Sequence, residues 1–272
     1  MQQLMQRLPL WRREDRIRIH GIFTDIDDTL TTDGAITPDA LQSLADLKAA
    51  GLHVIPITGR PIGWSEPFST TWPVDAIVAE NGSVAFRSDQ QQEDGKPLKI
   101  YQQDESLRAK NYARMQEVAQ QIVREVPGAM LATDSPGRET DIAIDHSEFT
   151  HLPQSSIDQA VAIMRAAGMN ATVSSIHING WFGDHNKLEG ARWIVRELFG
   201  RDLDKELDHW VYVGDSTNDQ LMFKTFANSI GVANVARFVP QLKDLPKYIT
   251  EGERGAGFTE MTKALLQTHS NR

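Results

Sequence analysis

The sequence of 272 residues contains no cysteine. This absence excludes disulfides and thiolate metal sites, and it is compatible with a reducing compartment. No stretch reaches the ~18 apolar residues that a membrane-spanning helix needs. Residues 1–20 alternate arginine with apolar side chains and lack the continuous apolar run of a secretory signal. Together, these absences predict a soluble cytoplasmic protein.

An excess of positive charge is also lacking. Lys and Arg number 28 against 37 Asp and Glu, which gives a formal net charge of −9. Nucleic acids and anionic membranes usually bind basic surfaces, so neither is expected as a partner. A phosphorylated small molecule remains compatible, because a bound cation can invert the local charge. The length allows two domains, and nothing in the sequence predicts the oligomeric state.

The most informative stretch is the acidic segment 25–31, Asp-Ile-Asp-Asp-Thr-Leu-Thr. It follows residues 17–24, whose β-branched and aromatic side chains predict a buried strand. Three carboxylates at a strand end do not belong in a core, because unpaired buried charge is costly. In open parallel sheets this end is where ligands bind. Clustered carboxylates there favour a hard cation such as Mg²⁺, and a solvated acidic turn is the alternative.

Further strand and helix patterns predict a parallel sheet. A helix is expected from the N-cap Thr37 to Gly51. Three more buried strands each end in polar residues, and these strands span residues 52–57, 75–79 and 210–213. Strands that alternate with helices through short connections predict right-handed parallel βαβ units. The polar ends of the strands then lie at one edge of the sheet.

The pattern changes between residues 84 and 185. A polar loop is expected over 90–95, and apolar residues at a helical period predict amphipathic helices over 115–126 and 157–164. Short strand patterns lie between and after them. This segment is large enough for its own apolar core, so we expect an inserted α+β unit that interrupts the α/β pattern.

The strand ends together resemble the haloacid dehalogenase-like superfamily of phosphatases and phosphotransferases. Segment 25–31 resembles its first motif, Asp-x-Asp-x-Thr, and Thr58 ends a strand like its second motif. Lys187, at the start of a predicted helix, resembles the third motif, and Gly214-Asp215-Ser216-Thr217-Asn218-Asp219 resembles the fourth. The motifs are specific for the superfamily and not for a substrate.

The position of the insertion, between the second and third motifs, resembles a type II cap, and its modest size resembles the IIB subgroup. That subgroup includes sucrose-phosphate, trehalose-phosphate and mannosylglycerate-phosphate phosphatases, and phosphomannomutase. The resemblance spans nearly the whole chain. It implies a Rossmann-like α/β core of residues 1–83 and 186–272 and an inserted α+β cap of residues 84–185.

The resemblance implies a Mg²⁺-dependent phosphatase that acts on a small sugar phosphate or glycoside phosphate. Phosphoryl transfer needs an in-line nucleophile, neutralisation of phosphate charge and a proton for the leaving oxygen. Asp25 is expected to be the nucleophile and to form an aspartyl-phosphate, with Asp27 as general acid and then base. Lys187 is expected to neutralise the nucleophile and the phosphate as a point charge.

The expected metal set is Asp25, the backbone carbonyl of Asp27, Asp215 and Asp219. Asp219 has two alternatives, to orient a metal-bound water or to support Lys187. The phosphate is expected to be bound by Thr58, Gly59 and Asn218.

Seven residues of the hinge and cap are candidates for contacts with the substrate: Arg60, Glu80, Asn81, Arg138, Glu139, Asp141 and Trp181. Each has an alternative. Arg60 could pair with a carboxylate near the site or cap the next helix, and segment 80–82 could be a polar turn. Residues 137–141 could form a solvated charged hairpin, and Trp181 could pack at the hinge.

Two other functions remain open. A phosphohexomutase similar to phosphomannomutase would use the same aspartyl-phosphate and return the phosphoryl group to the substrate. A requirement for a bisphosphate activator would favour it. A non-catalytic phosphosugar-binding protein would be favoured by loss of Asp25, Asp27, Lys187 or Asp215, and all four are present.

Overall fold

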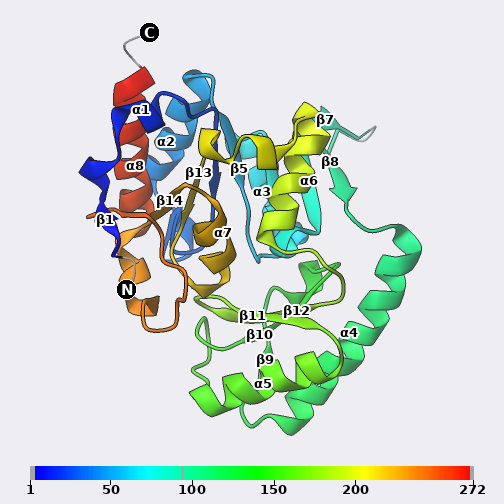
Figure 1. Ribbon diagram of the computed structural model, residues 1–272. Helices are drawn as coiled ribbons and strands as arrows, with labels where there is room; N and C mark the ends of the chain where they lie inside the picture. Colours follow the sequence, from blue (N-terminus) through cyan, green and yellow to red (C-terminus); the bar gives the residue numbers. More distant parts are fainter. Residues whose placement is uncertain (1–3, 93–94, 270–272) are drawn as a thin grey trace.

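The computed structural model describes residues 4–92 and 95–269. A large α/β core carries a smaller α+β unit at one end, drawn in green in Figure 1. Residues 93 and 94 of the loop expected over 90–95 lie outside the described part. Among the residues that the structure describes, no helix combines the length and the apolar character that crossing a bilayer requires.

The core is built on a six-stranded sheet in which every pair is parallel. From one edge to the other its strands are β1 (Gln6–Arg7), β15 (Tyr248–Ile249), β14 (Asn228–Gly231), β13 (Trp210–Gly214), β2 (Gly21–Thr24) and β5 (His53–Pro56). The expected parallel α/β core is thereby confirmed. In the central pair β13–β2, Val213 lies opposite Thr24, so the segments that follow these two strands meet.

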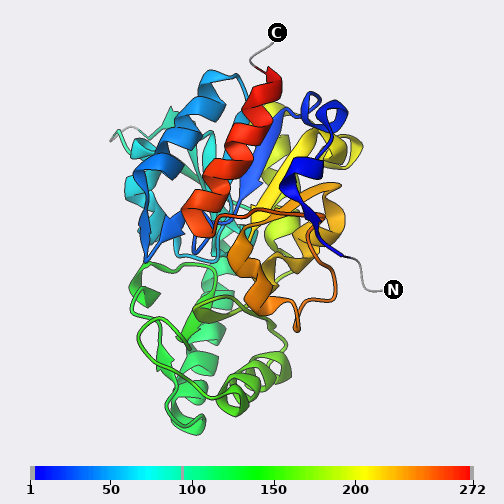
Figure 2. The ribbon, with the colours of Figure 1, turned by 90° about the vertical axis from the view of Figure 1, so that its left-hand side faces the viewer.

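Helices cover both faces of this sheet because successive strand residues point to opposite sides. Ile22 belongs to one apolar cluster with α2 (Pro38–Ala49) and α8 (Arg254–His269). Its neighbour Phe23 belongs to a second cluster with α6 (Lys187–Phe199) and α7 (Gln220–Thr225). Figure 2 shows α2 and α8 side by side on the first face. A single helical turn, α1 (Arg13–Arg16), lies beside α8.

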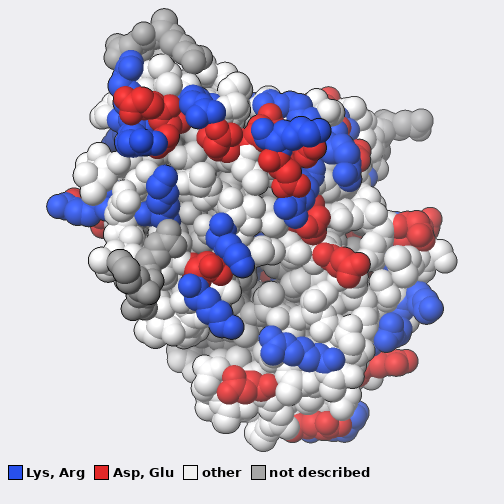
Figure 3. Space-filling view, in the orientation of Figure 1, with Lys and Arg blue, Asp and Glu red and all other residues white. Residues whose placement is uncertain are grey.

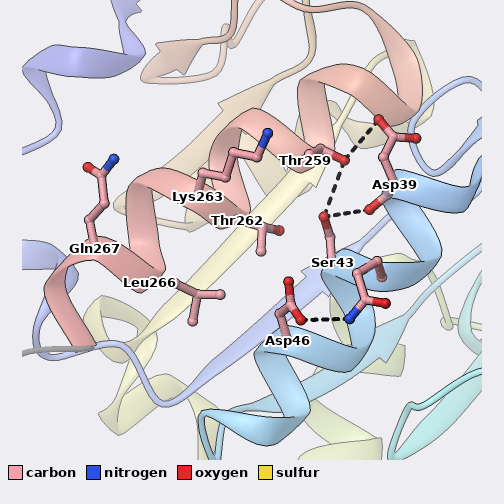
Figure 4. Close-up of a pocket in the computed structure, with 9 residues that line it drawn as sticks. Asp39, Ser43, Asp46, Thr259, Thr262, Lys263, Leu266 and Gln267 are labelled. Atoms are coloured by element: carbon pink, nitrogen blue, oxygen red, sulfur yellow. Dashed lines mark hydrogen bonds between the residues drawn. The ribbon is translucent and has the colours of Figure 1, made fainter.

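The α2–α8 contact leaves a groove of about 430 Å³ on the outside of the core (Figure 4). All of its lining residues come from these two helices. Ser43 Oγ links them, because it donates to Asp39 O at 2.8 Å and lies 3.2 Å from Thr259 Oγ1. The groove contains none of the motif residues that the sequence singles out.

A second, antiparallel sheet extends the core. Strand β6 (Ala76–Ala79) meets the chain after β5 in a parallel bridge between Ile57 and Val78. It then pairs with β7 (Val84–Gln91), and β7 pairs with β8 (Pro97–Tyr101). This sheet packs against α3 (Ile62–Thr71) through an apolar cluster.

The boundary expected at residue 84 coincides with the start of β7, and it stays a prediction. Strand β7 pairs with β6, β8 pairs with β7, and neither joins the smaller sheet. The smaller unit, called the cap below, comprises residues 105–181.

The cap has a four-stranded antiparallel sheet in the order β11 (Asn170–Val173), β12 (His177–Trp181), β10 (Ile142–Asp145) and β9 (Met130–Leu131). Helices α4 (Glu105–Glu125) and α5 (Gln154–Ala166) pack on one face, with Met115, Ile144 and Met164 in a separate apolar cluster. The expected α+β unit with its own core is therefore present. The other face of the sheet turns toward the core domain, where Asn179 Nδ2 lies 3.4 Å from Gly59 O.

Short segments complete the chain. A hairpin of β3 (Thr31–Thr32) and β4 (Ala35–Ile36) follows the acidic stretch. Short 3₁₀ helices span η1 (Leu8–Leu10), η2 (Glu80–Gly82), η3 (Ser135–Gly137), η4 (Leu203–Lys205), η5 (Leu207–His209), η6 (Thr217–Asp219) and η7 (Ala233–Phe238).

Candidate active site

The carboxyl ends of three parallel strands and the start of one helix meet at a single edge of the core sheet. Asp25 follows β2, Thr58 follows β5 and Asp215 follows β13, and all three side chains are buried. Lys187 begins α6 and is also buried. The structure thus brings the four expected motifs together, at the edge of the sheet where the sequence places them.

Lys187 lies between two carboxylates. Its Nζ is 2.9 Å from Asp25 Oδ1 and 2.7 Å from Asp219 Oδ1. Burial acts to lower the pKa of Lys187, but the neighbouring Asp219 and Asp25 outweigh it and hold that pKa above its usual value. Asn186 fixes the start of the helix, since its Oδ1 accepts the N–H groups of residues 188 and 189. The site therefore contains a fixed positive charge beside Asp25.

Both carboxylate oxygens of Asp219 accept hydrogen bonds from protein groups. Its Oδ1 accepts from Lys187 and from the Tyr212 hydroxyl. Its Oδ2 accepts the backbone N–H groups of Asp215 at 2.9 Å and Ser216 at 3.1 Å. Of the two roles expected for Asp219, these contacts favour support of Lys187.

Asp25 and Asp215 fit a hard cation. Carboxylate oxygens of Asp25, Asp215 and Asp219 lie within 4.8 Å of one another. Asp215 Oδ2 accepts from Asn234 at 2.9 Å and Arg237 at 3.2 Å. Its buried Oδ1 accepts no hydrogen bond from any described residue. A divalent cation with oxygen ligands would give this oxygen the partner that it lacks.

The raised pKa values of Asp25 and Asp215 agree with a site that binds a cation. Burial raises the pKa of Asp25 to about 7, although Lys187 acts in the opposite direction. Burial and the nearby carboxylates Asp219 and Asp25 raise the pKa of Asp215 well above its usual value. A bound cation favours the charged form of both groups.

Asp27 lies at the other side of the site, paired with Arg60. Arg60 Nε donates to Asp27 Oδ1 at 3.0 Å and to Oδ2 at 3.1 Å. The guanidinium also reaches two cap carboxylates, Asp134 at 3.3 Å and Glu148 at 2.9 Å. Of the alternatives expected for Arg60, the structure shows the pairing with carboxylates near the site.

The residues expected to bind phosphate, Thr58, Gly59 and Asn218, each have a hydrogen-bond partner in the protein. Thr58 is buried, and its hydroxyl oxygen accepts the N–H of Arg60 at 3.0 Å. The carbonyl of Gly59 accepts from Arg138 of the cap at 2.9 Å. Asn218 lies on η6, where its Oδ1 accepts from Ser216 Oγ at 2.8 Å. These placements are compatible with a phosphate site, and the role of each residue stays a prediction.

The hinge residues join core and cap. The Glu80 carboxylate is fully buried and accepts the N–H groups of Ile62, Glu139 and Thr140. Burial raises the pKa of Glu80, although these hydrogen bonds oppose the shift. Asn81 Nδ2 lies 3.3 Å from Asp141 Oδ2. Both hinge side chains are thus bound to protein groups.

The four cap residues expected to contact substrate also have protein partners. Arg138 Nη1 lies 2.7 Å from Asp141 Oδ1, and both side chains are buried. Glu139 accepts from Lys99 at 2.6 Å, and Trp181 Nε1 donates to the carbonyl of His185. A substrate role for these residues remains a prediction, and their contacts are those of a core–cap junction.

Sequence reasoning missed the cap loop that does border the site. A cleft of about 440 Å³ is lined by, among others, Asp27, Asp28, Asp33 and Arg60 of the core and Glu148 and Phe149 of the cap. Phe149 is 68% exposed. The Asp145 carboxylate accepts the N–H groups of residues 147–150 and so fixes the loop. The sequence signal for this loop is Asp145, an aspartate at the end of a strand that is followed by a polar turn.

The charged side chains on the visible face of the molecule are mixed in sign. In Figure 3, Lys and Arg side chains lie among Asp and Glu over the core, and this face shows no extended basic patch among the described residues. The hollow between core and cap is bordered by both signs. Neither sign of charge therefore dominates this face of the molecule.

Comparison with known proteins defines the class. The family profile of haloacid dehalogenase-like hydrolases matches residues 22–167, which is more than half of the chain. The protein belongs to this family of hydrolases. The expected enzyme class, a phosphatase, is confirmed.

Individual relatives are distant but cover nearly the whole chain. A Streptococcus pyogenes serotype M6 protein named "Putative phosphatase M6_Spy0533" is 23% identical over 87% of this chain and 94% of its own length. Phosphoglycolate phosphatase 1 of Saccharolobus solfataricus is 22% identical over 90% of this chain and 95% of its own. The sucrose-phosphatase structure from Synechocystis, with sucrose and phosphate, covers 90% of this chain and 97% of its own at a TM-score of 0.63 and 16% identity.

Proposed function

We propose that this protein is a Mg²⁺-dependent phosphatase that hydrolyses the phosphomonoester of a small sugar or glycoside through an aspartyl-phosphate on Asp25. The observation that carries the proposal is the buried contact of Lys187 with Asp25, next to the unpartnered oxygen of Asp215. A carboxylate held beside a fixed cation can approach a phosphate without strong charge repulsion.

In the first step, a carboxylate oxygen of Asp25 attacks phosphorus, and the bond from phosphorus to the sugar oxygen breaks. The carboxyl of Asp27 gives its proton to the leaving oxygen, so the sugar departs as an alcohol. Lys187 and the Thr58 hydroxyl offset the charge on the phosphate oxygens. The products of this step are the free sugar and phosphorylated Asp25.

In the second step, water attacks phosphorus of the aspartyl-phosphate. The Asp27 carboxylate takes a proton from this water, and the bond between phosphorus and Asp25 breaks. Asp25 returns to a carboxylate, Asp27 is again a carboxylic acid and inorganic phosphate leaves. Cap closure would exclude bulk water in the first step, which needs the proton of Asp27.

Asp25, the carbonyl of Asp27 and Asp215 would hold Mg²⁺, which supplies charge stabilisation for the phosphate when bound. Asp219 then acts on Lys187 and not on the metal. The four hydrogen bonds that Asp219 accepts support this division of roles.

A sugar is the substrate class that the cleft supports best. Carboxylates such as Asp33 and Glu148 accept hydrogen bonds from hydroxyls, and the exposed ring of Phe149 offers an apolar surface to a sugar face. A leaving group of one or two sugar rings suits a cleft of about 440 Å³. The sucrose-phosphatase likeness supports the same class.

The proposal is tested by phosphate release from a panel of phosphomonoesters with and without Mg²⁺. The panel contains sucrose, trehalose, mannose and glucose phosphates, a phosphorylated glycosyl-glycerate and phosphoglycolate. We expect Mg²⁺-dependent release from at least one sugar phosphate and none from Asp25→Asn. Preference for phosphoglycolate over every sugar would overturn the substrate class. Release from no member by folded protein would overturn the phosphatase and direct the test to a mutase with a bisphosphate activator.

A further inference from the structure

Arg60 is the one residue of the Thr58-Gly59-Arg60 segment whose side chain crosses from the core to the cap. Its Nε points at both oxygens of Asp27, while Nη1 and Nη2 reach Asp134 and Glu148 of the cap. Its side chain is 8% exposed. The guanidinium therefore connects the expected acid–base residue directly to the cap.

The cap side of this connection is itself fixed. Glu148 accepts from Arg60 through Oε1 and lies 2.8 Å from His177 Nε2 through Oε2. Burial acts to raise the pKa of Glu148, but the hydrogen bonds from His177 and Arg60 and the charge of Arg60 lower it to about 2. The same loop is fixed by Asp145 at the end of β10. Glu148 thus stays charged and oriented on a rigid loop.

On the core side, the orientation of the Arg60 guanidinium depends on its contacts with the cap. Apart from the cap carboxylates, the contacts recorded for the Arg60 side chain are Asp27 and the ring of Trp64, whose centroid is 5.2 Å from the guanidinium. A free arginine side chain samples many rotamers, which contacts at both ends restrict. If the cap moves away, Arg60 loses two of its three carboxylate partners. The guanidinium is then no longer held in the orientation that directs its Nε at Asp27.

We infer that Arg60 is a positioning residue that couples closure of the cap to the placement of Asp27. When the cap is closed, Glu148 and Asp134 hold the guanidinium, and the guanidinium holds Asp27 at the leaving-group side of the site. When the cap is open, Asp27 is released from this arrangement. Transfer of a proton from Asp27 to the leaving group is thereby confined to the closed state. This inference rests on the proposed phosphatase function.

The inference predicts a dependence on the leaving group. A sugar alkoxide is a poor leaving group and needs the proton of Asp27, whereas p-nitrophenolate leaves without one. Disturbing the placement of Asp27 should therefore slow hydrolysis of an alkyl phosphate more than that of an aryl phosphate. A merely structural role of Arg60 would lower both activities together.

The test compares kcat and KM for glucose 6-phosphate, or the best sugar phosphate of the panel, with those for p-nitrophenyl phosphate. For Arg60→Lys, whose single ammonium cannot span both sides, we expect kcat/KM for the sugar phosphate to fall about 10²-fold. We expect kcat/KM for p-nitrophenyl phosphate to stay nearly unchanged, because kcat/KM reports the first step and excludes the attack of water that both substrates share. Glu148→Gln, which weakens the contact from the cap side, should shift kcat/KM in the same direction by a smaller factor.

Lys99→Gln is the matched control. Lys99 forms another core–cap ion pair, with Glu139 at 2.6 Å, and touches neither Arg60 nor Asp27 in the described contacts. It should leave the ratio of the two kcat/KM values unchanged. Amide hydrogen exchange gives a readout independent of turnover, because Arg60→Lys should speed exchange of residues 146–150 in the free protein.

If Arg60→Lys is folded and loses both activities equally, the coupling is overturned. A change in KM for the sugar phosphate alone would also overturn it and make Arg60 a substrate-binding residue. If the unmodified protein hydrolyses neither phosphate, the proposed function fails instead. If the unmodified protein hydrolyses both phosphates, the proposed function stands, and the Arg60→Lys result then tests the coupling alone.

Discussion

At the scale of single residues, the site consists of buried charges with compensating partners. Lys187 neutralises Asp25 and is itself held by Asp219, and Tyr212 adds a hydrogen bond to Asp219. Removing one member of such a group leaves a buried charge without its partner, which costs more than the pair contributes. The roles of the individual carboxylates can therefore be separated by conservative substitutions.

Asp215→Asn and Asp219→Asn should differ in their effect on metal binding. We expect Asp215→Asn to abolish Mg²⁺ binding in isothermal titration calorimetry, because the unpartnered oxygen of Asp215 is the proposed ligand. Asp219→Asn should retain binding and lower kcat by about 10–100-fold, since Asp219 acts through Lys187. Loss of binding in both variants to the same extent would make Asp219 a metal ligand.

His185 predicts a pH dependence of stability. Its ring nitrogens have no hydrogen-bond partner among the described residues, and burial lowers its pKa to about 4. The unfolded chain, with a pKa near the ordinary value of about 6.5, binds a proton first as the pH falls. Stability contributed by neutral His185 is therefore complete above pH 6.5 and is lost as the pH falls toward 4.

The matched variant is His185→Phe, which keeps a ring to stack on Trp181. Between pH 7 and pH 5 the free energy of unfolding of the unmodified protein should fall by about 2 kcal/mol more than that of the variant. Urea denaturation at both pH values measures this difference. Parallel pH profiles of the two proteins would refute the assignment.

At the scale of elements, two glycines allow the hinge to approach the helix that carries Lys187. Gly82 in η2 has φ +110°, and a Cβ on Gly190 of α6 would lie 2.5 Å from the Gly82 Cα. Backbone lies on both sides of this contact, so no side chain can move aside. The close approach places the start of α6 against the segment after β6.

Gly190→Ala should destabilise the protein although alanine favours helices. The added methyl forces α6 and η2 apart, which we expect to cost about 1–3 kcal/mol in urea denaturation. Because Lys187 lies on the same helical turn, kcat should fall as well. Gly200→Ala, at the other end of α6 with open space around it, is the control and should leave kcat unchanged. Equal effects on kcat would contradict the role of the contact.

The parallel core could be predicted from the sequence because each strand there is a short apolar run with a polar end. The β6–β7–β8 sheet could not, because pairing depends on a turn at Glu80 and Asn81 with positive φ values of 47° and 56°. These are unusual for residues other than glycine, so the sequence gives little sign of the reversal. The pairing of β7 with β6 could therefore not be predicted.

At the scale of the whole molecule, a buried polar network joins the core and the cap. Arg138 binds Asp134 and Asp141 within the cap and the Gly59 carbonyl of the core. Arg138→Leu should lower the free energy of unfolding by about 3–5 kcal/mol, because it leaves the buried Asp141 without its cationic partner. Arg124→Leu, which removes an exposed ion pair of α4, should cost well under 1 kcal/mol. Similar costs for the two variants in urea denaturation would contradict this account.

The sequence predicted the core of the candidate site because its residues follow strands whose ends converge at one sheet edge. It did not identify Glu148 or Phe149, because their position depends on how the cap sits on the core. The contact of Arg138 with the Gly59 carbonyl was hidden for the same reason. Contacts between segments far apart in the chain have no local pattern from which to predict them.

The central claim is that Asp25 becomes phosphorylated during turnover. The most direct test is acid quench of Asp27→Asn with p-nitrophenyl phosphate, whose leaving group needs no proton from residue 27, and Mg²⁺. Borohydride reduction and mass spectrometry of the peptide around residue 25 follow. Loss of the Asp27 base should slow water attack, so the account predicts accumulation of the aspartyl-phosphate and its reduction product at Asp25. Phosphate release by the unmodified protein with no label at Asp25, or with label at another residue, would contradict it.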